Sequence, residues 1–355
     1  MKKLLVITVI LFTTHLSFSQ YNLEEGYIKT VSNNNAEASF TFKHLRIYPL
    51  MAGEKFNEAH KDIGKYSTLK ESLEQKKILI TETDGGNNNQ NIVNNNVQNS
   101  NNNQQQTNIR QNNINVQQNI STGGNARVNT LYVQNTSKDT IYIMAGEVVK
   151  GGKQDRVLAQ DMILPPDNKK VDISVFCVEH GRWSYKESDK FDQYFSVSSN
   201  SVRQKVIKEK NQSAVWEEVG KTVTKNKTKT STGTYTSLIN SKEYNQELKE
   251  YLNYFLKSLN SKSNCIGFAG VSGNKIIGCD IFASPDLFSK QKETILKGYI
   301  TETIINGGTI KVQYNEVEKY LTELLTTQQE KQDAVINKKG GQYKHNNKKI
   351  HITTF

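Results

Sequence analysis

The sequence predicts an α+β fold, with an antiparallel β-rich first half, helices and a further hairpin in the second half, and a disordered Asn/Gln-rich loop interrupting the first half. Two observations lead to this class. Up to about residue 183, apolar residues alternate with polar ones, as in half-buried strands. After residue 200, apolar residues recur instead with the period of an amphipathic helix.

Strand patterns and turn signals alternate through the first half. The polar run between residues 135 and 139 predicts a β-hairpin joining the segments 128–134 and 140–144. Gly151-Gly152 predicts a second turn, and a short helix is expected over residues 69–75. The expected strands are Ser39–Leu50, Ile78–Thr81, Val128–Gln134, Thr140–Met144 and Val171–Val178.

Helical stripes dominate the second half, and two of them carry capping-box spacing at their starts. Asn240 with Glu243 and Asn315 with Glu318 predict where those two helices begin. A hairpin turning at Gly273-Asn274 separates them. The expected elements are helices at Gln212–Val219, Tyr244–Leu259, Pro285–Ile304 and Val317–Leu325, and strands at Cys265–Ala269, Lys275–Phe282 and Ile350–Phe355.

The first residues read as a secretory signal. Lys2 and Lys3 precede a mostly apolar run from Leu4 to Phe12, and small residues end at Ser19. The run is too short to cross a bilayer. We therefore predict a signal peptide over residues 1–19, cleavage near Ser19, a periplasmic or secreted location, and no transmembrane segment in the mature chain.

One tract contributes nothing to a core, since 25 of the 39 positions from Asn87 to Asn125 are Asn or Gln. Such a composition cannot offset the entropy of ordering, so we predict a disordered insertion over residues 83–126 within one α+β domain spanning residues 20–355. A tolerated loop insertion is the simpler interpretation of the tract, and self-association through its amides is the alternative.

Charge and cysteine usage narrow the function classes. Cleavage of the signal would lower the formal net charge from +11 to +9, but the basic residues are scattered, so no nucleic-acid partner is predicted. Cys177, Cys265 and Cys279 lie within apolar strand patterns and are best read as buried small residues, with a bridge between the last two as the alternative. No metal site is predicted, the cofactor and oligomeric state stay unknown, and no common hydrolase or dinucleotide motif occurs.

The segment from Gly146 to Arg156 is the first candidate site. Glu147, Gln154 and Arg156 flank the Gly-Gly turn, so a carboxylate, an amide and a guanidinium are available to grip a polar or anionic ligand. An exposed hairpin turn is the structural alternative.

The second candidate is the strand end from Phe176 to Trp183. Cys177 and Glu179 share one face, so burial of the thiol would carry Glu179 inward, where Arg156 or Arg182 must pair with it. Glu147 and Glu179 are candidate acids or bases, and Gln154, Arg156, Arg182 and Trp183 are candidate ligand-binding residues. A purely structural ion-pair network is equally open. Asp280 is either a solvent-facing residue or a third site carboxylate.

Three runs carry a family resemblance: Ala145–Arg156, Phe176–Trp183 and Gln212–Trp216. Together with Gly278–Asp280, Phe282–Pro285 and His351, they resemble the domain family named for its association with ADP-ribosylglycohydrolases and rhodanese phosphatases. The resemblance spans most of the chain apart from the Asn/Gln tract. It implies a context near NAD and ADP-ribose metabolism, and it assigns no catalytic residue.

The sequence thus leaves two function hypotheses. In the first, an exported protein of uncertain activity binds or hydrolyses a phosphorylated nucleotide-like or ADP-ribose-related ligand, an anionic small molecule. In the second, the protein is a non-catalytic periplasmic or cell-envelope module whose polar residues form a structural network.

Overall fold

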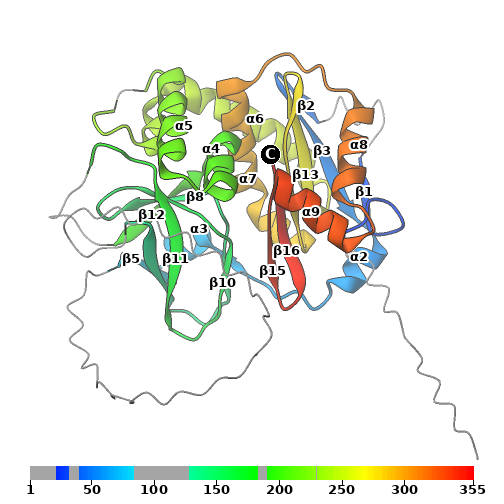
Figure 1. The fold of residues 1–355 in the computed structure, drawn as a ribbon, viewed down its shortest axis with the longest axis horizontal. Helices are drawn as coiled ribbons and strands as arrows, with labels where there is room; N and C mark the ends of the chain where they lie inside the picture. The colour runs from blue at the N-terminus through cyan, green and yellow to red at the C-terminus, as the bar shows by residue number, and fades with distance from the viewer. Residues whose placement is uncertain (1–20, 32–39, 84–127, 183–189, 229) are drawn as a thin grey trace, which may run out of the picture.

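The computed structural model describes residues 21–31, 40–83, 128–182, 190–228 and 230–355. It confirms the α+β class. A barrel-like half with helices α4 and α5 lies beside a half built on a larger sheet (Figure 1).

The larger sheet has seven antiparallel strands in the order β1-β3-β13-β14-β16-β15, with β2 paired to β3. Helices α6 and α7 pack on one face through Phe268 of β13, and α8 and α9 on the other through Ala269 and Val271. Because both faces are covered, the central strand β13 is buried along its whole length. The elements of this half are β1 (Ile28–Thr30), β2 (Thr41–Phe42), β3 (Leu45–Ala52), α2 (Glu54–Ala59), α6 (Lys242–Asn260), β13 (Cys265–Ser272), β14 (Lys275–Phe282), α7 (Pro285–Asn306), α8 (Tyr314–Leu324), α9 (Gln329–Lys339), β15 (Gly340–His345) and β16 (Lys348–Thr354).

The second sheet has six antiparallel strands in the order β12-β8-β9-β11-β6-β5. An isolated antiparallel bridge between Thr81 of β5 and Lys190, the residue before β12, joins the two edge strands, so the sheet curls into a barrel. Inward residues such as Ile80, Leu158 and Val175 form its core. The strands are β5 (Ile78–Glu82), β6 (Thr130–Asn135), β8 (Glu147–Gly151), β9 (Arg156–Leu158), β11 (Lys170–Cys177) and β12 (Phe191–Val197).

Smaller elements close the barrel and cover its outside. A three-stranded sheet in the order β10-β7-β4 adds Ile141, Ile143 and Leu164 to the barrel core. Outward Val148 and Val157 pack instead against Val215 and Val219 of α5. These elements are β4 (Ser67–Thr68), α3 (Leu69–Glu74), β7 (Ile141–Ile143), β10 (Met162–Leu164), α4 (Asn200–Gln204), the π-helix η1 (Lys205–Glu209), α5 (Gln212–Lys225) and the 3₁₀-helix η2 (Tyr235–Asn240).

The hairpin predicted between residues 128–134 and 140–144 is wrong. Strand β6 pairs with β5 and β11, whereas β7 pairs with β10 and β4 in the other sheet. The Asn135 side chain redirects the chain, because its Nδ2 donates to the carbonyls of Asp139 and Leu164 at 2.7 and 3.1 Å. The polar loop therefore connects a strand of the six-stranded sheet to a strand of the three-stranded sheet.

Other predicted boundaries shift by a few residues. The Ser39–Leu50 strand is a short hairpin, β2–β3, turning at Lys43 with φ of 49°. Helix α6 is capped by Ser241 rather than Asn240, and α8 has its capping box at Gln313 and Glu316, two residues before the predicted pair. The hairpin at Gly273, where φ is 62°, is confirmed.

Two predicted segments, the signal peptide over residues 1–19 and nearly all of the insertion over residues 83–126, lie outside the described residues. None of the helices in the described ranges combines the length and apolar character that a bilayer span requires.

Candidate functional site

Most sequence-predicted site residues meet at one end of the barrel, which we call the Arg156 end. Strands β5, β8 and β11 finish there, and β6, β9 and β12 begin there. The Arg156 end comprises Glu82, Gly151–Arg156, Glu179 and Arg182, which are joined by hydrogen bonds and ion pairs.

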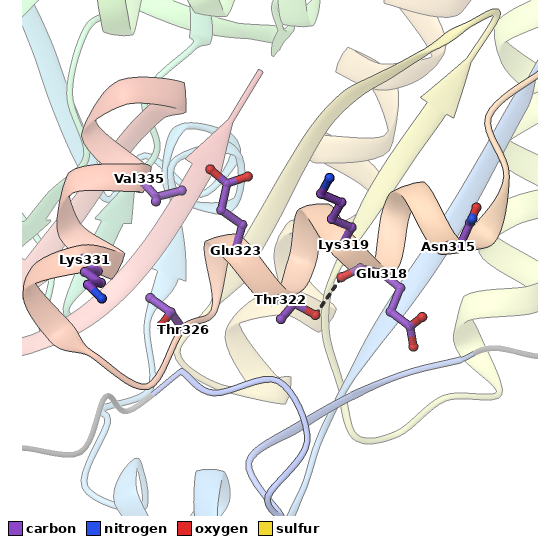
Figure 2. A pocket seen from close by; sticks show the side chains of 8 residues that line it. All are labelled: Asn315, Glu318, Lys319, Thr322, Glu323, Thr326, Lys331 and Val335. Carbon is purple, nitrogen blue, oxygen red and sulfur yellow. Dashed lines mark hydrogen bonds between the residues drawn. The ribbon is translucent and has the colours of Figure 1, made fainter.

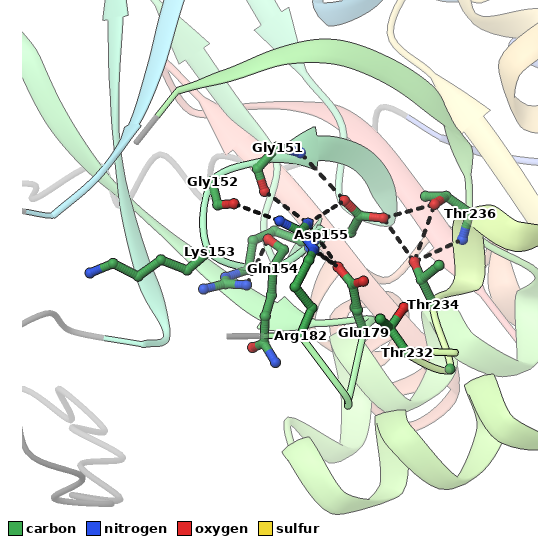
Figure 3. A network of polar contacts seen from close by, with 12 residues as sticks. Gly151, Gly152, Lys153, Gln154, Asp155, Glu179, Arg182, Thr232, Thr234 and Thr236 are labelled. Carbon is green, nitrogen blue, oxygen red and sulfur yellow. Dashed lines mark hydrogen bonds and ion pairs between the residues drawn. The ribbon is translucent and has the colours of Figure 1, made fainter. Parts of the chain in front are cut away.

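Arg182 holds the Gly-Gly turn in place (Figure 3). Its guanidinium donates to the carbonyls of Gly152 and Gly151 at 2.8 and 3.4 Å. It also lies 2.8 Å from a carboxylate oxygen of Glu179 and 3.3 Å from one of Asp155. Glu179 is buried, as its face of the strand predicts, and it accepts the Asp155 backbone N–H at 3.1 Å. Of the two arginines that the sequence offered as its partner, Arg182 forms the ion pair.

Asp155 extends this network to the segment before η2. Its Oδ2 accepts the hydroxyls of Thr234 and Thr236 at 2.8 and 2.7 Å, and its Oδ1 accepts the Gly151 N–H at 3.3 Å. Asp155, Glu179 and Arg182 are thus paired with one another and with neighbouring protein groups. Lys153 and Gln154 point their side chains away from this network (Figure 3).

Arg156 lies on the inner side of the barrel and is fully buried. Its Nη1 donates to the Gln154 carbonyl at 2.8 Å, and its Nη2 lies 3.5 Å from a carboxylate oxygen of Glu82. Its guanidinium carbon lies 6.0 Å from the centre of the Phe191 ring. Among the described residues, its Nε has no hydrogen-bond partner.

Arg156 and Arg182 differ from each other, and from the buried Arg203 of α4, in how many of their N–H groups have acceptors. Arg182 has four acceptors. Buried Arg203 has a two-point contact with Asp280 at 2.7 and 3.1 Å, although its Nε, like that of Arg156, has no partner among the described residues. Charge-assisted N–H···O contacts usually measure about 2.7–2.9 Å, so the contact of Arg156 to Glu82 is long. Arg156 is a buried cation with an incomplete set of acceptors, which calls for an explanation.

Glu147 does not join Glu179. Glu147 is the first residue of β8, and Gly151, which Arg182 of the Glu179 network contacts, is the last. At about 3.3 Å per residue, the strand separates these two ends by about 13 Å. Glu147 accepts the Met144 N–H at 2.8 Å, while its Oε1 has no partner among the described residues. Burial raises the pKa of Glu147 to about 8, so the group is largely protonated at neutral pH.

A second polar group, the central ion cluster, joins the barrel half to the larger sheet. It consists of Asp161, Arg203, Asp280, Tyr299 and His351. His351 lies between two carboxylates, with Nδ1 2.7 Å from Asp161 and Nε2 3.0 Å from Asp280. Tyr299 donates its hydroxyl to Asp280 at 2.6 Å.

The opposite charges in the cluster keep His351 protonated and Asp280 ionised despite their burial. Burial opposes an imidazolium, but Asp161 and Asp280 outweigh it and raise the pKa of His351 to about 9. Burial likewise opposes an ionised Asp280, but Arg203 and His351 hold its pKa below the usual value. Asp280, left open by the sequence, is therefore a buried ion-pair residue that faces no solvent.

Gly146 makes room for the central ion cluster, and its replacement is a direct test of that packing. Its φ is 92°, and a Cβ there would lie 2.7 Å from Cγ of Arg203. We expect Gly146→Ala to lower stability by about 2–3 kcal/mol in urea unfolding. Gly220→Ala is the matched control because nothing lies within 4 Å of its Cβ position in α5, and it should not destabilise. Equal effects of the two substitutions would contradict this account.

Sequence reasoning missed Glu82, Asp161, Arg203 and Tyr299. Glu82 had a usable signal: Ile78 and Ile80 point into the barrel, so alternation carries Glu82 inward as well. Asp161 lies in a short connection and pairs with a histidine 190 positions away, so no local pattern marks it. Trp183, a predicted ligand-binding residue, lies outside the described residues.

Cysteines and concavities add no further site residue. All three cysteines are free and buried, as the preferred interpretation held. The ranges described contain no group of three or more His, Cys, Asp or Glu side chains that could hold a metal ion. The concavity between α8 and α9, about 570 Å³, is lined by none of the predicted site residues (Figure 2).

Comparison with known proteins yields one family. Residues 35–354 match the model of the ARG and Rhodanese-Phosphatase-superfamily-associated Protein domain. No curated protein and no solved structure matches the chain. The match covers the barrel, both polar networks and the larger sheet apart from β1.

Proposed function

We propose that this chain, which belongs to the ARG and Rhodanese-Phosphatase-superfamily-associated Protein domain family, binds a phosphorylated, ADP-ribose-related ligand at the Arg156 end of its barrel. The observation that carries the proposal is the buried, incompletely satisfied guanidinium of Arg156. A desolvated cation lacking acceptors is stabilised by an anion, and arginine suits phosphate geometry. The ends of β-barrels are also common places for small-molecule sites.

The proposed roles follow from the contacts. Arg156 contacts a phosphate, Gln154 orients the ligand through its amide, and Arg182 is a positioning residue that fixes the Gly-Gly turn. Trp183, which follows Arg182, is proposed to stack on the base. The family's naming association with ADP-ribosylglycohydrolases supports ADP-ribose as the first ligand to test.

The proposal favours binding over hydrolysis. Acid–base hydrolysis by Glu147 and Glu179 would need both carboxyl groups beside one reacting bond. Glu147 is instead protonated at the far end of β8, and Glu179 is held by Arg182. We also propose that the protein acts in the periplasm or outside the cell, which the apolar run from Leu4 to Phe12 supports.

A thermal-shift titration with ADP-ribose, AMP and NAD tests the binding. A ligand at millimolar concentration with micromolar affinity should add about 4 kcal/mol of stability. The double variant Arg156→Met/Glu82→Gln removes both charges of the pair together, so it should fold and give no shift. Lys138→Gln, in the exposed loop before β7, removes one positive charge elsewhere and should keep the full shift.

Absence of a shift in the unmodified protein with all three ligands would overturn the proposal. Turnover is measured in the same samples by chromatography of the ligand. We expect the ligand to be recovered intact, and hydrolysis that is lost in Glu179→Gln would restore the catalytic interpretation.

A non-catalytic structural module is the second candidate, and the closed network of Asp155, Glu179 and Arg182 favours it. Under that function, Glu179→Ala should lower the melting temperature by several degrees because Arg182 loses a partner. It should leave every ligand-dependent measurement unchanged. A reduced ADP-ribose shift in this variant would instead tie the network to binding.

A further inference from the structure

We propose that Glu82 is an internal competitor for the ligand: its carboxylate occupies the side of Arg156 that a ligand phosphate would take, and it thereby limits the affinity for anions. This inference rests on the proposed function and names a specificity-determining residue for the same site. It follows from the placement of Glu82, from the glycine beside it and from the weakness of its contact with Arg156.

Glu82 is placed to meet Arg156 by the barrel itself. It is the last residue of β5 and points inward, where it is 4% exposed. Its Oε1 accepts the Lys153 N–H at 2.9 Å and lies 3.5 Å from Nη2 of Arg156. The same oxygen therefore makes a shorter contact with the backbone of the turn than with the guanidinium.

Gly152 makes this position possible. Its φ is 51°, and a Cβ on it would lie 2.7 Å from Oε1 of Glu82 and 2.3 Å from the Phe191 ring. A side chain at residue 152 would therefore collide with both the carboxylate and the ring. The carboxylate thus occupies the space on the Gly-Gly turn that faces Arg156.

Competition follows from charge and contact length. A phosphate that replaces Glu82 could bind Nη2 and the unpartnered Nε together, which the carboxylate does not do in this arrangement. The carboxylate must first leave Arg156, and its negative charge opposes the incoming anion. Neutralising Glu82 without changing its shape should therefore raise the affinity for anions for two reasons. It removes the repulsion of the anion, and it leaves Arg156 without a counter-charge.

Calorimetric titration of Glu82→Gln with ADP-ribose and inorganic phosphate tests the inference. We expect both anions to bind about tenfold more tightly than to the unmodified protein, as charge pairs across binding sites are coupled by this much or more. The variant should also melt lower without ligand and recover with phosphate, because an uncompensated buried guanidinium is costly. Glu74→Gln, an exposed carboxylate at the end of α3, makes the same charge change elsewhere and should leave both affinities unaltered.

Glu82→Asp keeps the test decisive if the glutamine variant does not fold. It retains the charge but withdraws it from Arg156 by one methylene, so a smaller gain in affinity is expected. Unchanged or weaker binding in both variants, with the unmodified protein still binding ADP-ribose, would refute the competition and leave the proposed function standing. Absence of binding in every form of the protein would instead refute the proposed function.

Discussion

Replacing Asp280 with alanine is expected to remove about 3–5 kcal/mol of stability, because it leaves buried charges without their partner. Asp280 is fully buried and accepts hydrogen bonds from Arg203 of α4, Tyr299 of α7 and His351 of β16. Its loss therefore affects three elements at once. Urea unfolding at pH 6 measures the change directly.

Asp286→Ala serves as the control for this substitution. Asp286 is exposed in the first turn of α7 and lies 3.8 Å from Lys290, so its loss should cost about 0.3–1 kcal/mol. The double variant Asp280→Leu/Arg203→Met should recover part of the stability by removing the opposite charges together. A cost below about 1 kcal/mol for Asp280→Ala would show that the central ion cluster does not support the fold.

We expect the free energy of unfolding to fall as the pH rises from about 6.5 to 9. Below pH 6.5, buried His60 offsets the fall that Glu147 causes, because burial lowers the pKa of His60 to about 4 and the unfolded chain binds a proton there that the folded state does not. The pKa of Glu147 is raised from 4.5 to about 8, so the folded form keeps a proton that the unfolded chain releases above pH 4.5. The pKa of His351 is raised from 6.5 to about 9, so the stability it contributes is complete below pH 6.5 and is lost through pH 9. Both groups bind more protons in the folded state, which gives stability a negative slope with pH.

Glu147→Gln separates the two contributions. Glutamine resembles the protonated carboxyl and has no proton to lose, so the variant should be more stable than the unmodified protein by about 2–3 kcal/mol at pH 7. The remaining fall in its stability should lie between pH 6.5 and 9, where His351 titrates. Urea unfolding at half-unit steps of pH measures both slopes. A flat profile in the unmodified protein between pH 6.5 and 8, or a glutamine variant that is less stable at every pH, would argue against a protonated Glu147.

Local periodicity explains which parts of the fold were predictable. The stripe from Tyr244 to Leu259 and the alternation from Val171 to Val178 depend only on neighbours in sequence, and both elements form where expected. Strand pairing depends on distant partners instead. The segments at residues 128–134 and 140–144 have good strand patterns, yet Asn135 sends them to different sheets.

The same distinction holds for the site. Alternation correctly placed Glu179 inward beside Cys177, and Arg182 was one of its two predicted partners. The choice between Arg156 and Arg182 depended on how the barrel closes, which no local pattern reports. Asp280 and His351 come together because β14 and β16 are neighbours, and Asp161 reaches them from the other half of the molecule.

The bridge between Thr81 and Lys190 also bears on how readily the chain aggregates through its strands. Unpaired strand edges recruit further strands, and amide-rich segments readily supply them. In the sequence, the tract from Asn87 to Asn125 follows β5, which would be an edge strand in an open sheet. Because that bridge joins β5 to the β12 side, the strand that precedes the tract in the sequence is a poor template for amyloid-like growth.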